Sequence, residues 1–244
     1  MIYLPAMKTM PFALLSLAAA GLLAAASPSA AQDGQAGPWK SLFDGKSLDA
    51  WRIYKKDTAP KLCEAPQTTA CWEIKDGVLM KDGNANDMIT REQFGDFEFE
   101  LEWKIGDAGN SGIFYRGSEE YNAIYWSAPE YQLLDNINAA DNKRPDHLAG
   151  AMYEFSSPPV DAVKPVGEWN QARIVAKGNH IEHWLNGKKT GEFNVGDEEW
   201  NTKLAASKFK VYPNFAKAPK GHFGIQGNHP GMLALRNIRV RELK

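Results

Sequence analysis

Hydrophobic and polar residues alternate with a period of two along most of the chain after residue 70. In the clearest case, the five apolar residues of Phe97–Ile105 alternate with three glutamates and a lysine. This pattern predicts a strand with one buried face. Shorter segments of the same kind predict further strands at Trp72–Ile74, Gly112–Arg116, Glu130–Leu134, Ala172–Lys177, Ile181–Leu185, Gly191–Phe193, Gly224–Gln226 and Leu235–Arg241.

Turn sequences separate these segments, and Asn186-Gly187 in particular predicts a two-residue hairpin. No stretch of ten or more residues has a helical period. Many short strands joined by turns predict an all-β sandwich or barrel. Three longer segments, residues 136–148, 156–167 and 212–221, are expected to be surface loops, where functional sites usually lie.

The N-terminus has the three-part pattern of a secretory signal. An apolar run, Phe12–Ala26, precedes the small residues Ser27–Ala31 and is shorter than the roughly 18 to 20 residues of a membrane anchor. The sequence therefore predicts a signal peptide at 1–31, a flexible lead-in at 32–38 and a single domain at 39–244. The expected location is the periplasm or the medium, with no membrane anchor after signal removal.

Composition narrows the function. The chain has 28 Lys and Arg against 30 Asp and Glu, a balance that argues against nucleic acid as a partner. The two cysteines, Cys63 and Cys71, predict a local disulfide in an oxidising compartment. No cofactor and no metal site are predicted, although oxygen ligands in acidic loops leave Ca²⁺ or another divalent cation open. Eight Trp and eight Tyr suit a carbohydrate cleft.

The segment from Glu130 to Asp135 carries the candidate catalytic carboxylates. Glu130 and Gln132 share one side of a regular strand, and a single β-bulge would bring Asp135 to the same side. A pair of carboxylates flanking the scissile bond is what glycosidic chemistry requires. The alternative is structural: Glu130 pairs with Arg116 across strands, and Asp135 begins a turn.

Two loop histidines, His229 and His147, are the candidate proton carriers, because a loop imidazole near a carboxylate can exchange protons near neutral pH. No spacing typical of a metal site, of a serine nucleophile elbow or of a nucleotide-binding loop occurs. The side chains predicted to bind substrate are Arg116, Gln132, Tyr115, Tyr153, Trp126 and Gln226.

The order of short motifs resembles the 3-keto-disaccharide hydrolase domain family. Trp39-Lys-Ser-Leu-Phe-Asp-Gly-Lys-Ser-Leu48, followed by Trp51, is similar to the opening of that domain. The later blocks, which follow in the family's order and extend the resemblance over residues 39–241, are Ser111–Arg116, Glu130–Asp135, Gly150–Tyr153, Gly167–Asn170, His183–Gly187, Gly224–Gln226 and Arg236–Arg239.

The resemblance implies a concanavalin A-like jelly roll of two antiparallel sheets that binds its ligand on the concave face. It also implies a small glycoside oxidised at C3 as substrate, cleaved by hydrolysis or by elimination. Elimination needs a base near C2, an acid near the leaving oxygen and a donor or cation at the ketone. Glu130, Asp135, a loop histidine and Arg116 are the candidates for these roles, which remain unassigned among them.

Two other functions stay open. One is a conventional retaining glycosidase. Laminarinase-type enzymes of similar architecture use an E-x-D-x-x-E strand, whereas this chain has Glu130-x-Gln132-x-x-Asp135, which disfavours double-displacement hydrolysis. The other is a non-catalytic glycan-binding module, in which aromatic rings stack on sugar.

Overall fold

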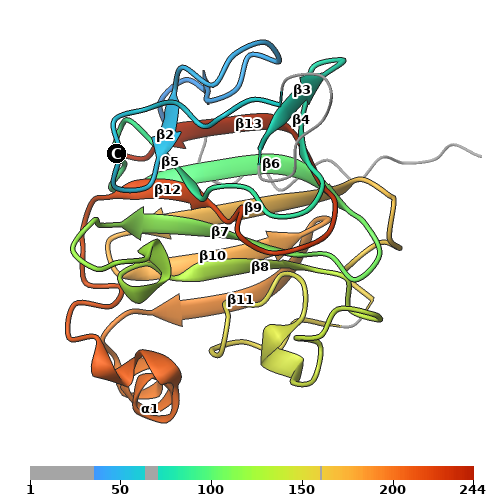
Figure 1. Cartoon of the computed structure of the whole chain (residues 1–244). Coiled ribbons are helices and arrows are strands. Elements are labelled where there is room, and N and C mark those ends of the chain that lie inside the picture. The colour runs from blue at the N-terminus through green and yellow to red at the C-terminus, as the bar shows by residue number, and fades with distance from the viewer. Residues whose placement is uncertain (1–35, 64–70, 160) are drawn as a thin grey trace, which may run out of the picture. The chain divides into compact units, whose positions relative to one another are not determined.

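The computed structural model describes residues 36–63, 71–159 and 161–244, which form two antiparallel β-sheets facing each other (Figure 1). The larger sheet has the order β11 (Lys188–Asn194), β10 (His180–Leu185), β9 (Asn170–Lys177), β6 (Phe97–Ile105), β13 (Leu233–Glu242), β4 (Val78–Lys81) and β3 (Glu73–Lys75), with β1 (Lys40–Ser41) paired to β13. The smaller sheet has the order β2 (Trp51–Ile53), β5 (Met88–Thr90), β12 (His222–Ile225), β7 (Asn110–Gly117) and β8 (Glu130–Leu134).

The predicted all-β sandwich is confirmed. Every predicted strand overlaps an observed one, and the bounds of β6 and β8 coincide with the prediction. The remaining strands, β1, β2, β4 and β5, have only two to four residues each, too few for an alternating pattern to stand out. The Asn186-Gly187 hairpin is also confirmed, since both residues have the positive φ angles, 50° and 79°, that this turn requires.

The core lies between the sheets and is rich in aromatic side chains. Phe223 of β12 packs against Phe97 and Phe99 of β6, with ring centroids 4.6 and 4.4 Å apart. On the opposite face of β6, Glu100 and Glu102 form ion pairs with arginines of β13. The alternation seen in the sequence therefore separates a buried aromatic face from a charged outer face.

The disulfide between Cys63 and Cys71 is present, as predicted. The predicted signal peptide and residues 32–35 lie outside the described residues. The end of the predicted lead-in is paired rather than free, because Ala36 bridges Leu243 and Gly37 N donates to Glu242 O at 2.8 Å. Within the described residues, no helix has the length and apolarity that crossing a membrane requires.

A nine-residue helix, α1 (Glu198–Ala206), was not predicted. Asp197 caps its first turn by accepting a hydrogen bond from Trp200 N at 2.7 Å, and Trp200 is its one buried residue. A single anchor gives no helical period in the sequence, which explains why the pattern did not reveal it. The helix matters because it leads into the 3₁₀ turn η4 (Lys208–Val211), which carries Lys208 to the site described below.

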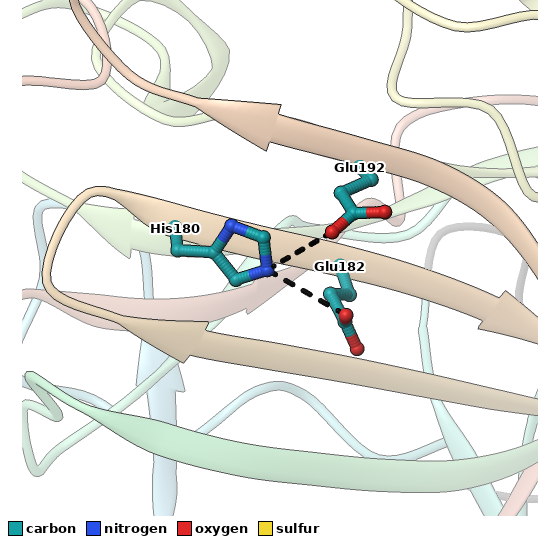
Figure 2. A group of neighbouring side chains, drawn as sticks. All are labelled: His180, Glu182 and Glu192. Atoms are coloured by element: carbon teal, nitrogen blue, oxygen red, sulfur yellow. Dashed lines mark ion pairs between the residues drawn. The ribbon is translucent and has the colours of Figure 1, made fainter.

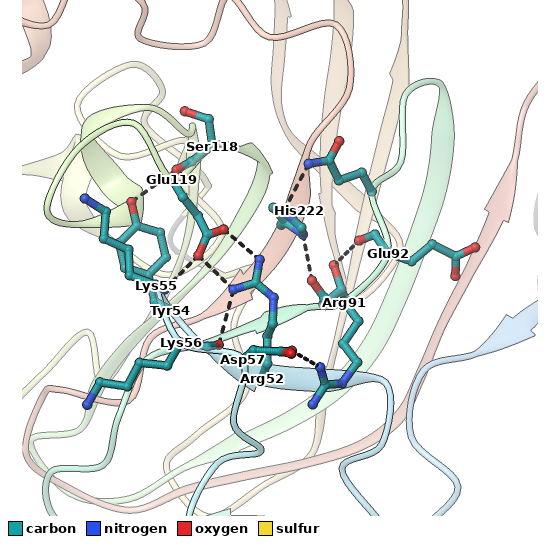
Figure 3. A network of polar contacts seen from close by, with 12 residues as sticks. Arg52, Tyr54, Lys55, Lys56, Asp57, Arg91, Glu92, Ser118, Glu119 and His222 are labelled. Atoms are coloured by element: carbon teal, nitrogen blue, oxygen red, sulfur yellow. Dashed lines mark hydrogen bonds and ion pairs between the residues drawn. The ribbon is translucent and has the colours of Figure 1, made fainter.

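A polar network fastens the loop between β7 and β8 to strand β2 (Figure 3). Arg52 donates two hydrogen bonds to the Glu119 carboxylate at 2.8 and 2.7 Å, and Tyr54 Oη donates to the Ser118 carbonyl at 3.1 Å. The hydrogen bonds from Arg52 lower the pKa of Glu119. The loop held in this way continues into the 3₁₀ turn η2 (Ile124–Trp126), which forms one wall of the site.

Candidate active site

A cavity of about 330 Å³ lies on the face of the smaller sheet that points away from the core. Strands β7 and β8 form its floor, and the turns η2 and η4, the loop after β8 and the loop after β12 form its walls. The lining side chains are those of Asn110, Tyr125, Trp126, Glu130, Gln132, Asp141, Tyr153, Lys208, Gln226, Asn228 and His229. Five of the residues predicted from the sequence therefore come together here with His229, and five more join them.

Glu130 is the central ionisable group of this cavity. It is 7% exposed, and no described residue forms a hydrogen bond with its carboxyl group. Burial raises its pKa to about 8, and the negative charges of Asp141 and Asp87 act in the same direction, whereas Lys208 opposes them. The carboxyl group is therefore largely protonated at neutral pH and can donate a proton.

Gly112 makes the space that the Glu130 side chain occupies. The two residues lie on neighbouring strands, where β7 pairs with β8 in regular antiparallel register. A Cβ atom on Gly112 would lie 2.0 Å from Glu130 Oε1, so any residue other than glycine would clash with the carboxyl group. The glycine thus lets the carboxyl group lie flat over the sheet.

Two buried amides lie beside Glu130. Gln132 and Gln226 are 1% and 5% exposed, and the Oε1 atom of each lacks a hydrogen-bond partner among the described residues. Gln132 Nε2 donates to Asn110 Oδ1 at 3.2 Å. A buried acceptor without a partner costs about 1–3 kcal/mol. Both side chains line the cavity, so a rotation of each amide would offer its oxygen to a ligand, such as a sugar hydroxyl group.

A second group of polar side chains forms the wall next to β8. Asp141 accepts a hydrogen bond from Tyr153 Oη at 3.0 Å and contacts His147 Nδ1 at 2.9 Å. The rings of His147 and Tyr153 stack with centroids 4.2 Å apart, and the Lys208 ammonium lies 4.2 Å from the Tyr153 ring centroid. Since His147 lies behind Tyr153 and does not line the cavity, it can act on a ligand only through Asp141 or Tyr153.

Trp126 provides an aromatic part of the cavity wall. Its indole stacks on Tyr212 with centroids 4.2 Å apart, and the Tyr125 ring lies 4.3 Å away. The apolar face of a sugar ring packs well against such a surface. The predicted role of Trp126 in sugar binding therefore fits its position.

His229 enters the cavity from the loop that follows β12. Burial lowers the pKa of its imidazole. The ring is therefore neutral at neutral pH and can accept a proton, whereas the neighbouring Glu130 can donate one. The environment thus raises the pKa of the carboxyl group and lowers that of the imidazole, and such a pair is the pattern expected of an acid and a base.

The structure does not place Asp135 in this site. The β7–β8 pairing runs from Glu130 to Leu134 without a register shift, so the bulge that would bring Asp135 to the Glu130 face is absent. The carboxylate instead accepts hydrogen bonds from Ala108 N at 2.8 Å and Ile137 N at 2.9 Å. Asp135 thus begins a turn, as the structural alternative stated.

Arg116 and Tyr115 also lie elsewhere. Arg116 has a φ of 51°, and its guanidinium donates to the carbonyls of Gly95 and Gly178 and pairs with Asp96 at 3.1 Å. The alternative in which Arg116 pairs with Glu130 is therefore wrong. Tyr115 points into the core, where its hydroxyl group lies 2.9 Å from Nε2 of His183.

The cation of this site is Lys208, which the sequence did not single out. It is one of many lysines, and its position depends on the unpredicted helix α1. Asp141, by contrast, lies in the predicted polar loop 136–148, where its acidic character and loop location were a usable signal.

One cluster on the other sheet has the residue types of a metal site (Figure 2). Nε2 of His180 lies 3.5 Å from Glu182 and 3.3 Å from Glu192, on β10 and β11. Nζ of Lys189 already lies 2.7 and 2.9 Å from the same two carboxylates. These residues therefore form a surface ion-pair network and are not part of the cavity around Glu130.

Comparison with known proteins relates the chain to a family. A 3-keto-alpha-glucoside-1,2-lyase-like domain matches residues 38–241. A protein of Bacteroides thetaiotaomicron named 3-keto-disaccharide hydrolase is 32% identical, over 83% of this chain and 78% of its own length.

Solved structures agree with this match. A Parabacteroides distasonis protein provisionally described as a glycosyl hydrolase is similar with a TM-score of 0.74 and 28% identity, over 84% of this chain and 94% of that one. A family GH16 endo-β-1,3(4)-glucanase, at 9% identity and a TM-score of 0.54 over 89% of this chain and 95% of that one, shares the fold alone. Together with the family match over nearly all of the described residues, these likenesses show that the chain belongs to the family of 3-keto-alpha-glucoside-1,2-lyase-like domains.

Proposed function

We propose that this protein is an enzyme that cleaves the glycosidic bond of glycosides oxidised to a ketone at C3. The observation that carries the proposal is the buried Glu130 carboxyl group, which is without a partner among the described residues and has a pKa raised to about 8. The name of the Bacteroides relative and the family match support the substrate class. A small glycoside fits a cavity of this size, since one sugar ring fills much of it.

The ketone makes an elimination route accessible. It acidifies the C2 hydrogen, which the neutral His229 imidazole removes as a proton. The electrons of the C2–H bond form a C1–C2 double bond, the C1–O bond breaks, and the leaving oxygen takes the proton of Glu130. The products are an enone sugar and a free alcohol or sugar, and addition of water to C1 of the enone completes a net hydrolysis.

Lys208 is the group best suited to the negative charge that develops on the ketone oxygen. Its ammonium lies on the cavity wall over Tyr153, and its charge already acts on Glu130. A fixed cation next to a developing oxyanion stabilises the transition state more than the ground state. The amide groups of Gln132 and Gln226, which line the cavity, are then the candidates for binding the sugar hydroxyl groups, and Trp126 for packing on the ring face.

The test is an incubation of purified protein with an oxidised disaccharide and with the same disaccharide unoxidised, followed by analysis of the products. We expect consumption of the oxidised sugar alone. Consumption of both would support a conventional glycosidase. Binding of the oxidised sugar without any consumption would support a glycan-binding module and would refute the proposal.

We also propose that the protein works outside the cytoplasm. The Cys63–Cys71 disulfide supports this location, because such bonds persist mainly in oxidising compartments. Cell fractionation with an antibody tests the proposal, and recovery of the protein in the cytoplasmic fraction with both thiols reduced would refute it.

A further inference from the structure

The loop Gly227–Gly231, which carries His229 into the cavity, is held by two charged side chains from outside the site. On one side, Asp87 Oδ1 accepts hydrogen bonds from Gly227 N at 2.8 Å and Asn228 N at 3.1 Å. On the other, Lys81 Nζ donates to His229 O at 2.7 Å and to Gly231 O at 3.1 Å. The loop backbone is thus fixed by a carboxylate at its start and an ammonium at its end.

Lys81 is unusual because it is a lysine in the interior. It is 2% exposed, and its third hydrogen bond goes to the carbonyl of Gly83 at 3.1 Å, so all three donors of the ammonium are used. Among the described residues no carboxylate forms an ion pair with it. An interior charge held only by carbonyl groups is expensive to bury, and an apolar side chain would fill the same space at lower free energy.

The environment of His229 contains both of these charges. The charged groups that act on the imidazole are Asp87 and Asp141, which favour its protonated form, and Lys81 and Lys208, which disfavour it. Asp87 and Lys81 are the largest of these four influences. The two residues that hold the loop are therefore also the two that most affect the charge state of its histidine.

We propose that Lys81 and Asp87 are positioning residues that hold His229 over the cavity and set the balance between its neutral and protonated forms. This inference rests on the role of His229 as the base in the proposed function. It extends that function to two residues outside the cavity, on β4 and on the segment before β5.

Substitutions of the two residues are expected to shift the pKa of His229 in opposite directions. In Lys81→Met the loss of a positive charge raises the pKa of His229. In Asp87→Asn the amide oxygen can keep both hydrogen bonds to the loop, yet the loss of negative charge lowers that pKa. NMR titration of the His229 Cε1 proton, assigned with His229→Gln, measures both shifts. Lys75→Met, which replaces the exposed lysine at the end of β3, is the matched control.

Turnover of the oxidised disaccharide supplies the second readout. We expect Lys81→Met to lower kcat roughly tenfold or more and to change KM less than about threefold, because the base is displaced while the sugar contacts remain. A general loss of structure would instead lower the melting temperature and the fraction of active protein. If Lys81→Met does not fold, Asp87→Asn still gives the titration.

The outcomes separate this inference from the proposed function. If the wild type consumes no oxidised disaccharide, the proposed function fails, but the opposite pKa shifts still establish that Lys81 and Asp87 control His229. If His229 titrates as in the wild type in both variants, or shifts in the same direction in both, the inference is wrong even where turnover is observed.

Discussion

The smaller sheet carries two polar regions that differ in how their charges are satisfied. In the network around Arg52 and Glu119, the guanidinium and the carboxylate are paired by two hydrogen bonds, which lower the pKa of the carboxylate (Figure 3). In the cavity, Glu130 has no hydrogen-bond partner among the described residues, and burial raises its pKa to about 8. The first arrangement holds a loop in place. The second arrangement lowers the stability of the fold, because a buried carboxyl group has no partner in the described part of the chain, and leaves that group able to bind a ligand.

The largest effect should come from removing the proton of Glu130. We expect Glu130→Gln to lower kcat by about 10²–10⁴-fold, the usual contribution of a general acid. Substrate binding should change much less, because the amide keeps the shape of the side chain. Steady-state kinetics on the oxidised disaccharide measures both, with Glu92→Gln as control, since Glu92 is exposed and paired with Lys40. If Glu130→Gln is fully active, Glu130 does not act as the acid.

The same substitution should alter the dependence of stability on pH. The folded state holds the Glu130 proton up to about pH 8, whereas the unfolded chain releases it near the ordinary value of 4.5. Between these pH values the unfolded state binds fewer protons than the folded state. The free energy of unfolding of the wild type therefore falls, as the pH rises, by up to about 1.4 kcal/mol per pH unit. Denaturant titrations at several pH values should show a weaker decline in Glu130→Gln. Parallel curves would mean that Glu130 is ionised in the folded protein.

Activity should depend on pH in a direction that reveals the role of Glu130. If it acts as the acid, kcat/KM falls about tenfold per pH unit above about 8, where the group loses its proton. If it acts as the base, activity rises through the same range. His229, whose pKa is lowered, should limit activity only below the ordinary histidine value of 6.5. If kcat/KM rises through pH 8, Glu130 is the base and the proposed acid and base roles of Glu130 and His229 are reversed.

The sequence revealed the strand of the site but only part of its chemistry. The alternation around Glu130 reports which side chains share a face, so Glu130 and Gln132 could be placed together from spacing alone. Arg116 could not be excluded in the same way. Its positive φ, next to a register shift where β12 meets β7, turns its side chain away from the face that regular alternation predicts.

Lys208 shows a different limit. It reaches the cavity because α1 and η4 are anchored by their buried residues, Trp200 and Phe209, which pack against Phe155 and Phe215. Those anchors are single aromatic residues in a polar segment, without the repeat that marks a helix in the sequence. A residue whose position depends on such tertiary packing cannot be assigned to a site from local pattern. The family resemblance, by contrast, needed only the order of motifs.

Breaking the satisfied network should reduce stability and spare catalysis. In Arg52→Met the partly buried Glu119 carboxylate loses both of its guanidinium hydrogen bonds, and we expect a loss of about 1–2 kcal/mol in the free energy of unfolding. Because η2 is also held by Tyr54 and by the core, kcat should fall by less than about threefold. Chemical denaturation and kinetics on the same preparation test this pair of outcomes. A large loss of kcat at unchanged stability would make the network part of the site.

The smallest effect on the stability of the fold should come from Gln226→Leu, which we expect to weaken substrate binding instead. The amide oxygen of Gln226 has no partner among the described residues, so replacing it with an apolar side chain of similar size should leave stability unchanged or raise it by up to about 1 kcal/mol. KM should rise about fivefold to thirtyfold, because a hydrogen bond to the sugar is lost. Arg52→Met and Gln226→Leu would then change opposite properties, stability in one and binding in the other. If Gln226→Leu instead destabilises the protein and leaves KM unchanged, the amide belongs to the fold, and an unpartnered oxygen is not a reliable sign of the ligand in this cavity.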